Sequence, residues 1–188
     1  VKVSRANYND ATASATLTIT KQAIELTADS GSWTYDASEH TKPSYTITDG
    51  SFATGEGLTS ATFAAASAIT NVGSVANTIT GVTPKDGTQE NDYAFTYKAG
   101  TLTITNATFS VTLTGGSWTY NGGAHSATLT GTQSSDTIEY RTSTNGGTTW
   151  STWSSTKPSV THVSDGPMQV QVKVSRANYN DATASATL

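Results

Sequence analysis

The sequence predicts an all-β protein made of two tandem β-sandwich modules stacked end to end. Residues 1–17 return letter for letter as residues 172–188, so the chain is periodic. A shorter period of 85 residues relates the motif Gly-Ser-Trp-Thr-Tyr at 31–35 to its second copy at 116–120. The chain also holds 38 Thr and 23 Ser against 13% charged residues. Because Thr packs well on a pleated strand and still meets water, this composition favours strands over long helices.

The two periods divide the chain into three parts. Residues 1–17 are expected to be the C-terminal strands of a preceding repeat module, residues 18–103 the first complete β module and residues 104–188 the second. The repeat pattern continues with Thr-Ile-Thr after the position of Leu188, so the second module is expected to lack its final strand end. Almost no linker separates the two modules, and such a short connection predicts a semi-rigid rod.

Alternating apolar and polar residues predict the strands of the first module. Ile24 and Leu26 alternate with polar neighbours, and Trp33 and Tyr35 share one face of the next strand. Residues 61–69 are rich in Ala, which favours a helix, but the flanking Thr and Gly residues favour a strand. A β-grasp-like module with a helix at this place is the alternative fold. Further strands are expected at residues 45–47, 75–80, 93–97 and 102–104, the last two forming a hairpin around residues 98–100.

The second module repeats the opening of the first. Phe109, Val111 and Leu113 take the places of the apolar residues that begin the first module, which predicts the same core strand. Asn-Gly turns are expected at residues 121–123 and 145–146, because Asn and Gly accept positive φ, and the clearest strand is expected at residues 168–174.

Composition and charge narrow the classes of function. A formal net charge of −4 and a pI near 5.2 give none of the basic character that nucleic-acid binding needs. No run of 18 apolar residues occurs, so no membrane insertion is expected in this segment. The chain contains no Cys, which removes disulfide, thiolate and Cys-zinc chemistry. No cofactor is expected.

The histidines and carboxylates do not predict a reactive or metal site. His40 and His125 each follow a Trp by seven residues, whereas His162 has no such partner. A metal site needs several converging ligands, and no His-x-His pair or carboxylate cluster accompanies these residues. No nucleophile motif such as Gly-x-Ser-x-Gly is present. The sequence therefore predicts neither a catalytic site nor a metal site.

The tryptophans divide into two pairs. Trp33 and Trp118 recur with the 85-residue period, so both are expected to be largely buried packing residues. Trp150 and Trp153 lie three residues apart, and on a strand this spacing places them on opposite faces, one packed inward and one exposed. The exposed ring, near Tyr140, is the candidate for stacking on a sugar.

Short motifs in both modules resemble a known family. They are Trp-Thr-Tyr-Asp at 33–36, Trp-Thr-Tyr-Asn-Gly-Gly at 118–123, Asn-Tyr or Asp-Tyr at 7–8, 92–93 and 178–179, and Gly-Thr-Leu-Thr-Ile at 100–104. They look like the MBG and YDG-type repeats of bacterial cell-surface proteins, modules grouped with bacterial immunoglobulin-like domains. The first module departs from this pattern, because Asp36 is followed by Ala37 where Gly is expected.

The resemblance implies an exported, multi-repeat adhesin at a bacterial cell surface. On this reading the chain is a structural stalk or spacer that contacts adjacent repeats of the same protein and projects a distal binding domain. The alternative is a module that binds host or matrix glycans, including mucin, through an exposed Trp. A stalk should lengthen with repeat number and show no saturable glycan binding, whereas a glycan-binding module should lose binding when that Trp is removed.

Overall fold

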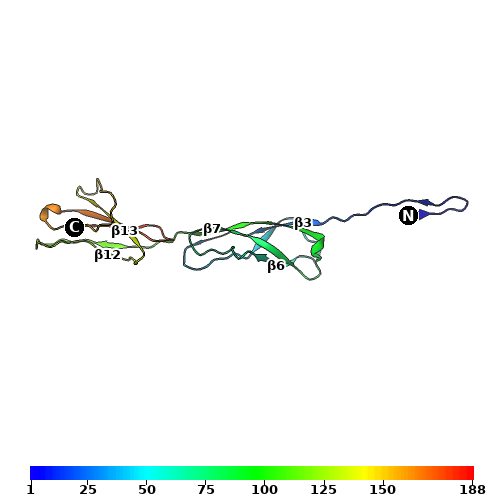
Figure 1. Ribbon diagram of the computed structural model, residues 1–188, viewed down its shortest axis with the longest axis horizontal. Coiled ribbons are helices and arrows are strands. Elements are labelled where there is room, and N and C mark those ends of the chain that lie inside the picture. The colour runs from blue at the N-terminus through cyan, green and yellow to red at the C-terminus, as the bar shows by residue number, and fades with distance from the viewer. The chain divides into compact units, whose positions relative to one another are not determined.

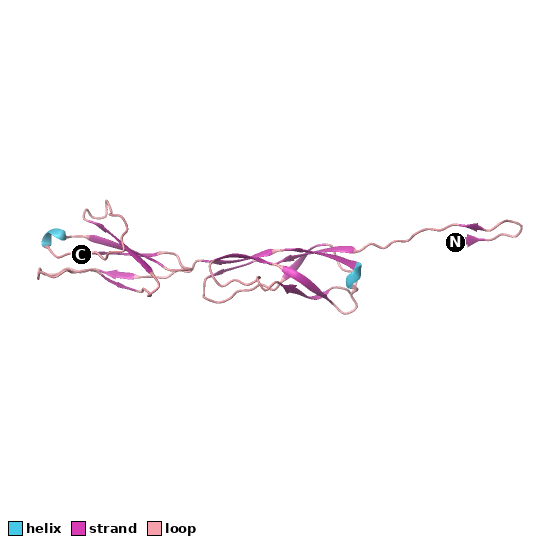
Figure 2. Ribbon diagram, in the orientation of Figure 1, coloured by secondary structure: helices cyan, strands magenta, loops and turns pink.

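The computed structural model describes all 188 residues, and the chain is all-β (Figures 1 and 2). Its only helices are two three-residue 3-10 turns, η1 (Glu90–Asp92) and η2 (Val163–Asp165). Neither is long or apolar enough to cross a membrane. The predicted fold class is therefore confirmed.

Contacts between residues divide the chain into two compact units. The first unit comprises Val1–Ser30, Lys42–Ser67 and Ala76–Gly100, and the second comprises Gly31–Thr41, Ala68–Val75 and Thr101–Leu188. The second unit thus contains two segments that belong, by sequence period, to residues 18–103. The module boundaries at 17/18 and 103/104 remain predictions from the repeat.

The first unit consists mainly of two small sheets. Strand β3 (Gln22–Ala28) lies at the centre of one sheet, antiparallel to β5 (Tyr45–Asp49) and parallel to β9 (Tyr93–Lys98). The other sheet pairs β6 (Leu58–Phe63) with β8 (Ile79–Pro84) in antiparallel orientation. Both sheets contribute to one core, whose buried residues are Ile24, Leu26, Ala28, Ile79 and Tyr93. A sandwich-like arrangement follows from this shared core.

The Ala-rich segment 61–69 forms no helix. It completes β6 as far as Phe63 and then turns, where the Ser67 N–H donates to the Ala64 carbonyl at 2.9 Å. The strand reading was correct up to Phe63, and the helix of the β-grasp-like alternative is absent. Cross-strand pairing with β8 outweighs the helix preference of a short Ala run.

The second unit contains three sheets. One has the order β4-β10-β7, built from β4 (Gly31–Thr34), β10 (Gly100–Thr105) and β7 (Gly73–Asn77). A second pairs β11 (Thr112–Thr114) with β12 (Thr128–Thr130). The third has the order β13-β14-β15, built from β13 (Thr137–Ser143), β14 (Gln169–Ser175) and β15 (Ala182–Thr187).

The predicted hairpin of residues 93–97 with 102–104 is wrong. Strand β9 pairs in parallel with β3, whereas β10 pairs in parallel with β4, so the two strands belong to different sheets. At Gly100, the first residue of β10, a Cβ atom would lie 2.4 Å from the Ala28 carbonyl oxygen. The chain therefore passes close against another backbone at this point and does not fold back on itself.

Strand β14 has the regular burial that its sequence predicts. Val170, Val172 and Val174 are almost fully buried, and the residues between them are half-buried. They form the core of the second unit with Leu113, Ala127, Tyr140 and Leu188. A second core in this unit joins Ile69, Leu102 and Ile104 to Trp33 and Tyr35.

The two copies of the repeated segment adopt the same hairpin. In the first copy, β1 (Lys2–Val3) pairs with β2 (Ala11–Thr12), and Lys2 lies opposite Thr12. In the second copy the equivalent Lys173 lies opposite Thr183. Both turns place their Asn at a φ of 67°. The two copies therefore share the turn and the pairing next to it, whereas the last strand runs through Thr187 in the second copy (β15) and ends at Thr12 in the first.

The surroundings of the two hairpins also differ. Val172 is fully buried, while Val1, in the same place of the same sequence, is 92% exposed. The second copy packs in the core of β13, β14 and β11, whereas every residue of the first copy is exposed. The same apolar side chains are thus buried in the second copy and exposed to solvent in the first.

Candidate functional site

The repeated Trp motif forms a compact local unit in both places. Trp33 stacks on His40 with ring centroids 4.8 Å apart, and Trp118 stacks on His125 at 4.7 Å. The Gly two residues before each Trp leaves room for the ring, because a Cβ atom at Gly31 would lie 2.2 Å from Trp33 Cη2. At Gly116 the equivalent distance to Trp118 Cζ2 is 2.8 Å. The motif therefore folds an indole ring back over its own backbone.

Hydrogen bonds fix the two histidines as structural residues. His40 Nε2 lies 3.0 Å from Asp36 Oδ1, and His125 Nε2 lies 3.2 Å from Asn121 Oδ1. The His40 backbone exchanges hydrogen bonds with Ile69 at 2.8 and 3.0 Å. The backbone N–H of Ser38 and the His40 ring lower the pKa of Asp36. The seven-residue spacing from Trp to His therefore places the imidazole ring against the indole ring in both motifs. The spacing alone did not predict this stacking.

The Trp118 site, in contrast to its counterpart, opens to solvent. Trp118 is 41% exposed and Tyr120 61%, whereas Trp33 is half-buried beside Leu102 and Ile104. The prediction that Trp118 is largely buried is therefore wrong. In the first motif Ile104 of β10 lies opposite Trp33 in the parallel pair.

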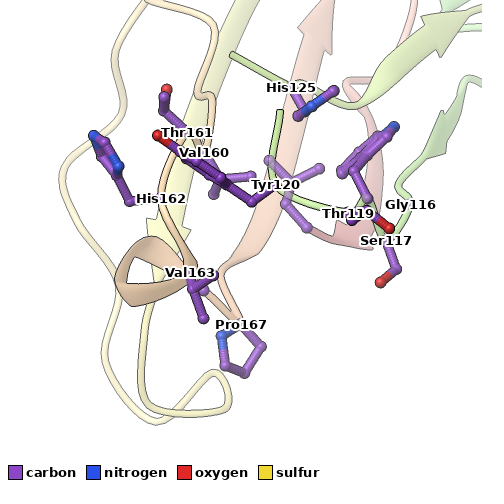
Figure 3. Close-up of a pocket in the computed structure, with 13 residues that line it drawn as sticks. Gly116, Ser117, Thr119, Tyr120, His125, Val160, Thr161, His162, Val163 and Pro167 are labelled. Atoms are coloured by element: carbon purple, nitrogen blue, oxygen red, sulfur yellow. The ribbon is translucent and has the colours of Figure 1, made fainter. Parts of the chain in front are cut away.

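A pocket of about 280 Å³ lies at this site (Figure 3). The segment 116–120 forms one side, and residues 160–163 with Pro167 form another. Tyr120 lies near the ring of His162, with centroids 6.1 Å apart. The lining residues are Gly116, Ser117, Trp118, Thr119, Tyr120, His125, Val160, Thr161, His162, Val163, Gly166, Pro167 and Leu188. They offer aromatic and apolar surface beside the imidazole rings of His125 and His162.

The residues predicted to contact glycans lie elsewhere in the second unit. Trp150 and Trp153 are in a loop after β13, and both rings lie over the guanidinium of Arg141, at 4.9 and 4.6 Å from its Cζ. The expectation that they point to opposite faces is wrong, because no strand spans them. Both are half-buried.

Tyr140 lies on the other face of β13 from Arg141 and is only 7% exposed. Its burial raises the pKa of its hydroxyl. The ring presents no free face to a ligand, so Tyr140 and the two tryptophans do not form one site.

The turn of the C-terminal hairpin contacts residues that belong, by the 85-residue repeat, to residues 18–103. The Val72 backbone N–H donates to Asn178 Oδ1 at 2.9 Å, and Asn178 Nδ2 donates to Asn71 Oδ1 at 3.1 Å. The Tyr179 ring makes an edge contact with Tyr35, with centroids 5.5 Å apart. Asn178 and Tyr179 therefore contact residues about 100 or more positions earlier in the chain, whereas their sequence predicts only a turn.

No three His, Cys, Asp or Glu side chains lie close enough to hold a metal ion. Comparison of the chain with protein-family models, with curated proteins and with solved structures gives no match.

Proposed function

We propose that this chain is a structural repeat of a bacterial surface adhesin, a stalk or spacer that projects a distal binding domain. The observation that carries the proposal is the duplicated hairpin. One 17-residue sequence forms the same hairpin twice, and the enclosed copy contacts Tyr35, Asn71 and Val72 of the preceding period through its Asn178-Tyr179 turn.

Such a junction is what a tandem spacer needs. A repeat that bonds to its neighbour through specific side chains limits the freedom between neighbours, so added repeats add length. In both modules the His of the Trp motif stacks on the Trp ring, and His40 also contacts the carboxylate of Asp36. These residues therefore have structural roles. The bacterial cell surface and the adhesin context rest on the family resemblance of these motifs.

Length measurement tests the proposal. Chains with one, two and three 171-residue periods should show a maximum dimension, by small-angle X-ray scattering, that rises by a constant increment per period. A dimension that rises much more slowly, as for modules that fold back on each other, would contradict a spacer role. The same chains should show no saturable signal when titrated with mucin-type glycans.

Glycan binding is the second candidate, and the exposed aromatic rings of the Trp118 site favour it. Sugars stack on exposed aromatic faces, and Trp118 and Tyr120 present such faces in one pocket. If a glycan does bind, Trp118→Ala and Tyr120→Ala should each abolish the binding, and Trp153→Ala should preserve it. Loss of binding in Trp153→Ala alone would instead place the sugar at the Arg141 cluster.

A further inference from the structure

Two exposed turns of the second unit share the sequence Asn-Gly-Gly, at residues 121–123 and 145–147. Asn is a thermolabile residue, most of all before Gly, because Gly carries no Cβ to shield its backbone nitrogen from the neighbouring side-chain amide. Since the local sequences are the same, any difference in reactivity between Asn121 and Asn145 depends on how the fold holds each amide.

The Asn121 amide is held through its oxygen alone. Its Oδ1 accepts a hydrogen bond from the Gly123 N–H at 2.9 Å and lies 3.2 Å from His125 Nε2. An amide oxygen only accepts, so the imidazole carries a proton on Nε2 and donates it here. The bond to Gly123 closes a turn around the Gly122 nitrogen, which keeps that nitrogen beside Cγ of Asn121. Both donors withdraw electrons from Cγ, the atom that a nucleophile attacks.

The first Trp motif shows that this place stabilises negative charge. Asp36 stands where Asn121 does, and its Oδ1 accepts from the Ser38 N–H at 2.8 Å and lies 3.0 Å from His40 Nε2. The Ser38 N–H and the His40 ring lower the pKa of Asp36. An oxyanion that forms on Oδ1 of Asn121 meets the same pair of donors.

Water reaches this place in both motifs. Asn121 and Gly122 are exposed, and a Cβ atom at Gly122 would meet nothing within 4 Å. Asp36 keeps 52% of its side chain exposed although β10 pairs with β4 next to it. A strand that covers the Trp ring therefore leaves this position open.

The Asn145 amide, in contrast, is held at both of its polar atoms. Its Oδ1 accepts from Ser143 Oγ and from the Thr149 N–H, both at 2.9 Å, and its Nδ2 donates to Thr149 Oγ1 at 2.8 Å. Ser143 is the last residue of β13 and is only 3% exposed. Attack by the Gly146 nitrogen requires the amide to turn and Nδ2 to depart, and both changes break these bonds.

We propose that Asn121 is a site of spontaneous deamidation in the folded chain and that the fold protects Asn145. The Gly122 nitrogen loses its proton and attacks Cγ of Asn121, and the new C–N bond closes a succinimide ring. The bond from Cγ to Nδ2 breaks, and Nδ2 leaves as ammonia after taking up a proton. Water then opens the ring at either carbonyl, which leaves aspartate or isoaspartate at position 121. The aspartate product gives the second Trp motif the Asp-His pair of the first.

The test compares the two sites within one full-length chain. The chain is incubated at neutral pH in water enriched in heavy oxygen, once folded in buffer and once unfolded in urea. Trypsin cleaves after Arg141 and separates the two sites, and mass spectrometry measures the exchange of NH2 for labelled OH at each. In buffer, Asn121 should react at least about tenfold faster than Asn145. In urea the two rates should be similar, because the local sequences are the same.

Two variants assign the difference to the contacts of each amide. His125→Phe keeps a ring beside Trp118 but removes the donor to Oδ1, so it should slow the reaction at Asn121 several-fold. Thr149→Val removes the acceptor of Nδ2 and should speed the reaction at Asn145 several-fold. Circular dichroism checks that each variant is folded, and the comparison of buffer with urea decides the question without either variant.

Four results would each overturn the proposal. They are equal rates in the folded chain, faster reaction at Asn145, a difference of the same size in urea, and an unreactive Asn121 in buffer when the unfolded chain reacts. The spacer role proposed above does not depend on this outcome.

Discussion

Asn178 accepts a hydrogen bond on its side-chain oxygen from the backbone N–H of Val72, 106 residues earlier in the chain. The bond spans 2.9 Å, and Asn178 adopts a left-handed backbone with a φ of 67°. Asn tolerates this conformation better than most residues, and its short side chain still carries a donor and an acceptor. A turn residue of the repeated hairpin therefore also links residues 172–188 to Asn71 and Val72.

Asn178→Ala should lower the free energy of unfolding of the second unit by about 1–3 kcal/mol, because Ala loses both side-chain hydrogen bonds and is strained at positive φ. Asn178→Gly removes the same bonds without the strain and should cost less. Asn7→Ala is the matched control for this strain, since Asn7 has the same φ in an exposed hairpin. Residue 7 lies outside the second unit, so the change should alter that unit's free energy of unfolding by less than about 0.5 kcal/mol. Urea unfolding followed by circular dichroism measures all three. Equal effects at residues 7 and 178 would show that the junction contributes nothing.

The ion pair of Asp136 and Arg176 makes stability depend on acid. Arg176 donates from Nε and Nη2 to the two carboxylate oxygens, both at 2.8 Å, and this pairing lowers the pKa of Asp136 to about 2. A carboxyl with a folded-state pKa below its unfolded value contributes stability above the unfolded pKa, and the contribution is lost as pH falls. The melting temperature should therefore fall between about pH 4 and pH 2. In Asp136→Asn this fall should be smaller.

A matched control uses the exposed copy of the same residue. Arg5 occupies the place of Arg176 in residues 1–17, where it contacts the Tyr8 ring. Arg5→Gln should leave the acid dependence unchanged, whereas Arg176→Gln should reduce it as Asp136→Asn does. The pKa values of Asp36 and Asp165 are also lowered, so some fall in melting temperature should remain in every variant.

Local patterns in the sequence carried the prediction of strands and turns. The alternation of Val170, Val172 and Val174 identified β14, and the exact repeat identified the hairpin and its copy. These features depend on residues close in sequence, and their physical cause acts at that range.

Features that depend on distant residues were missed. Whether a Trp is covered depends on which strand lies beside it, so Trp33 and Trp118 have the same local sequence and different exposure. Asn77 is another case: it is 1% exposed, and its side-chain nitrogen offsets the cost of burial by donating to the carbonyls of Asp29 and Lys42, both at 2.8 Å. No local signal distinguishes this buried Asn from a turn residue.

A single position in the two Trp motifs offers a test of backbone strain. Ala37 has a φ of 66°, and Gly122, at the same place of the second motif, has a φ of 77°. Positive φ costs Ala more than Gly, so Ala37→Gly should raise the free energy of unfolding by about 0.5–1 kcal/mol. Gly122→Ala should lower it by a similar or larger amount. Thermal unfolding of both variants measures the effect, and a loss of stability in Ala37→Gly would mean that unfolded-state entropy outweighs the strain.

The cluster of Arg141 with Trp150 and Trp153 predicts coupled, not contrasting, effects of the two tryptophans. Arg141 also donates from Nε to Gln171 at 2.7 Å, which holds its guanidinium between the two rings on the polar face of the β13–β14 pair. Trp150→Ala and Trp153→Ala should therefore cost similar amounts, within about 1 kcal/mol of each other. In a double-mutant cycle, each should couple to Arg141→Ala by about 0.5–2 kcal/mol, the range for a cation over an aromatic ring. Trp118→Ala shares no contact with Arg141 and should combine additively with Arg141→Ala, within about 0.5 kcal/mol. If Trp150→Ala and Trp153→Ala also combine additively with Arg141→Ala, the two rings cover the sheet without a specific interaction with the guanidinium.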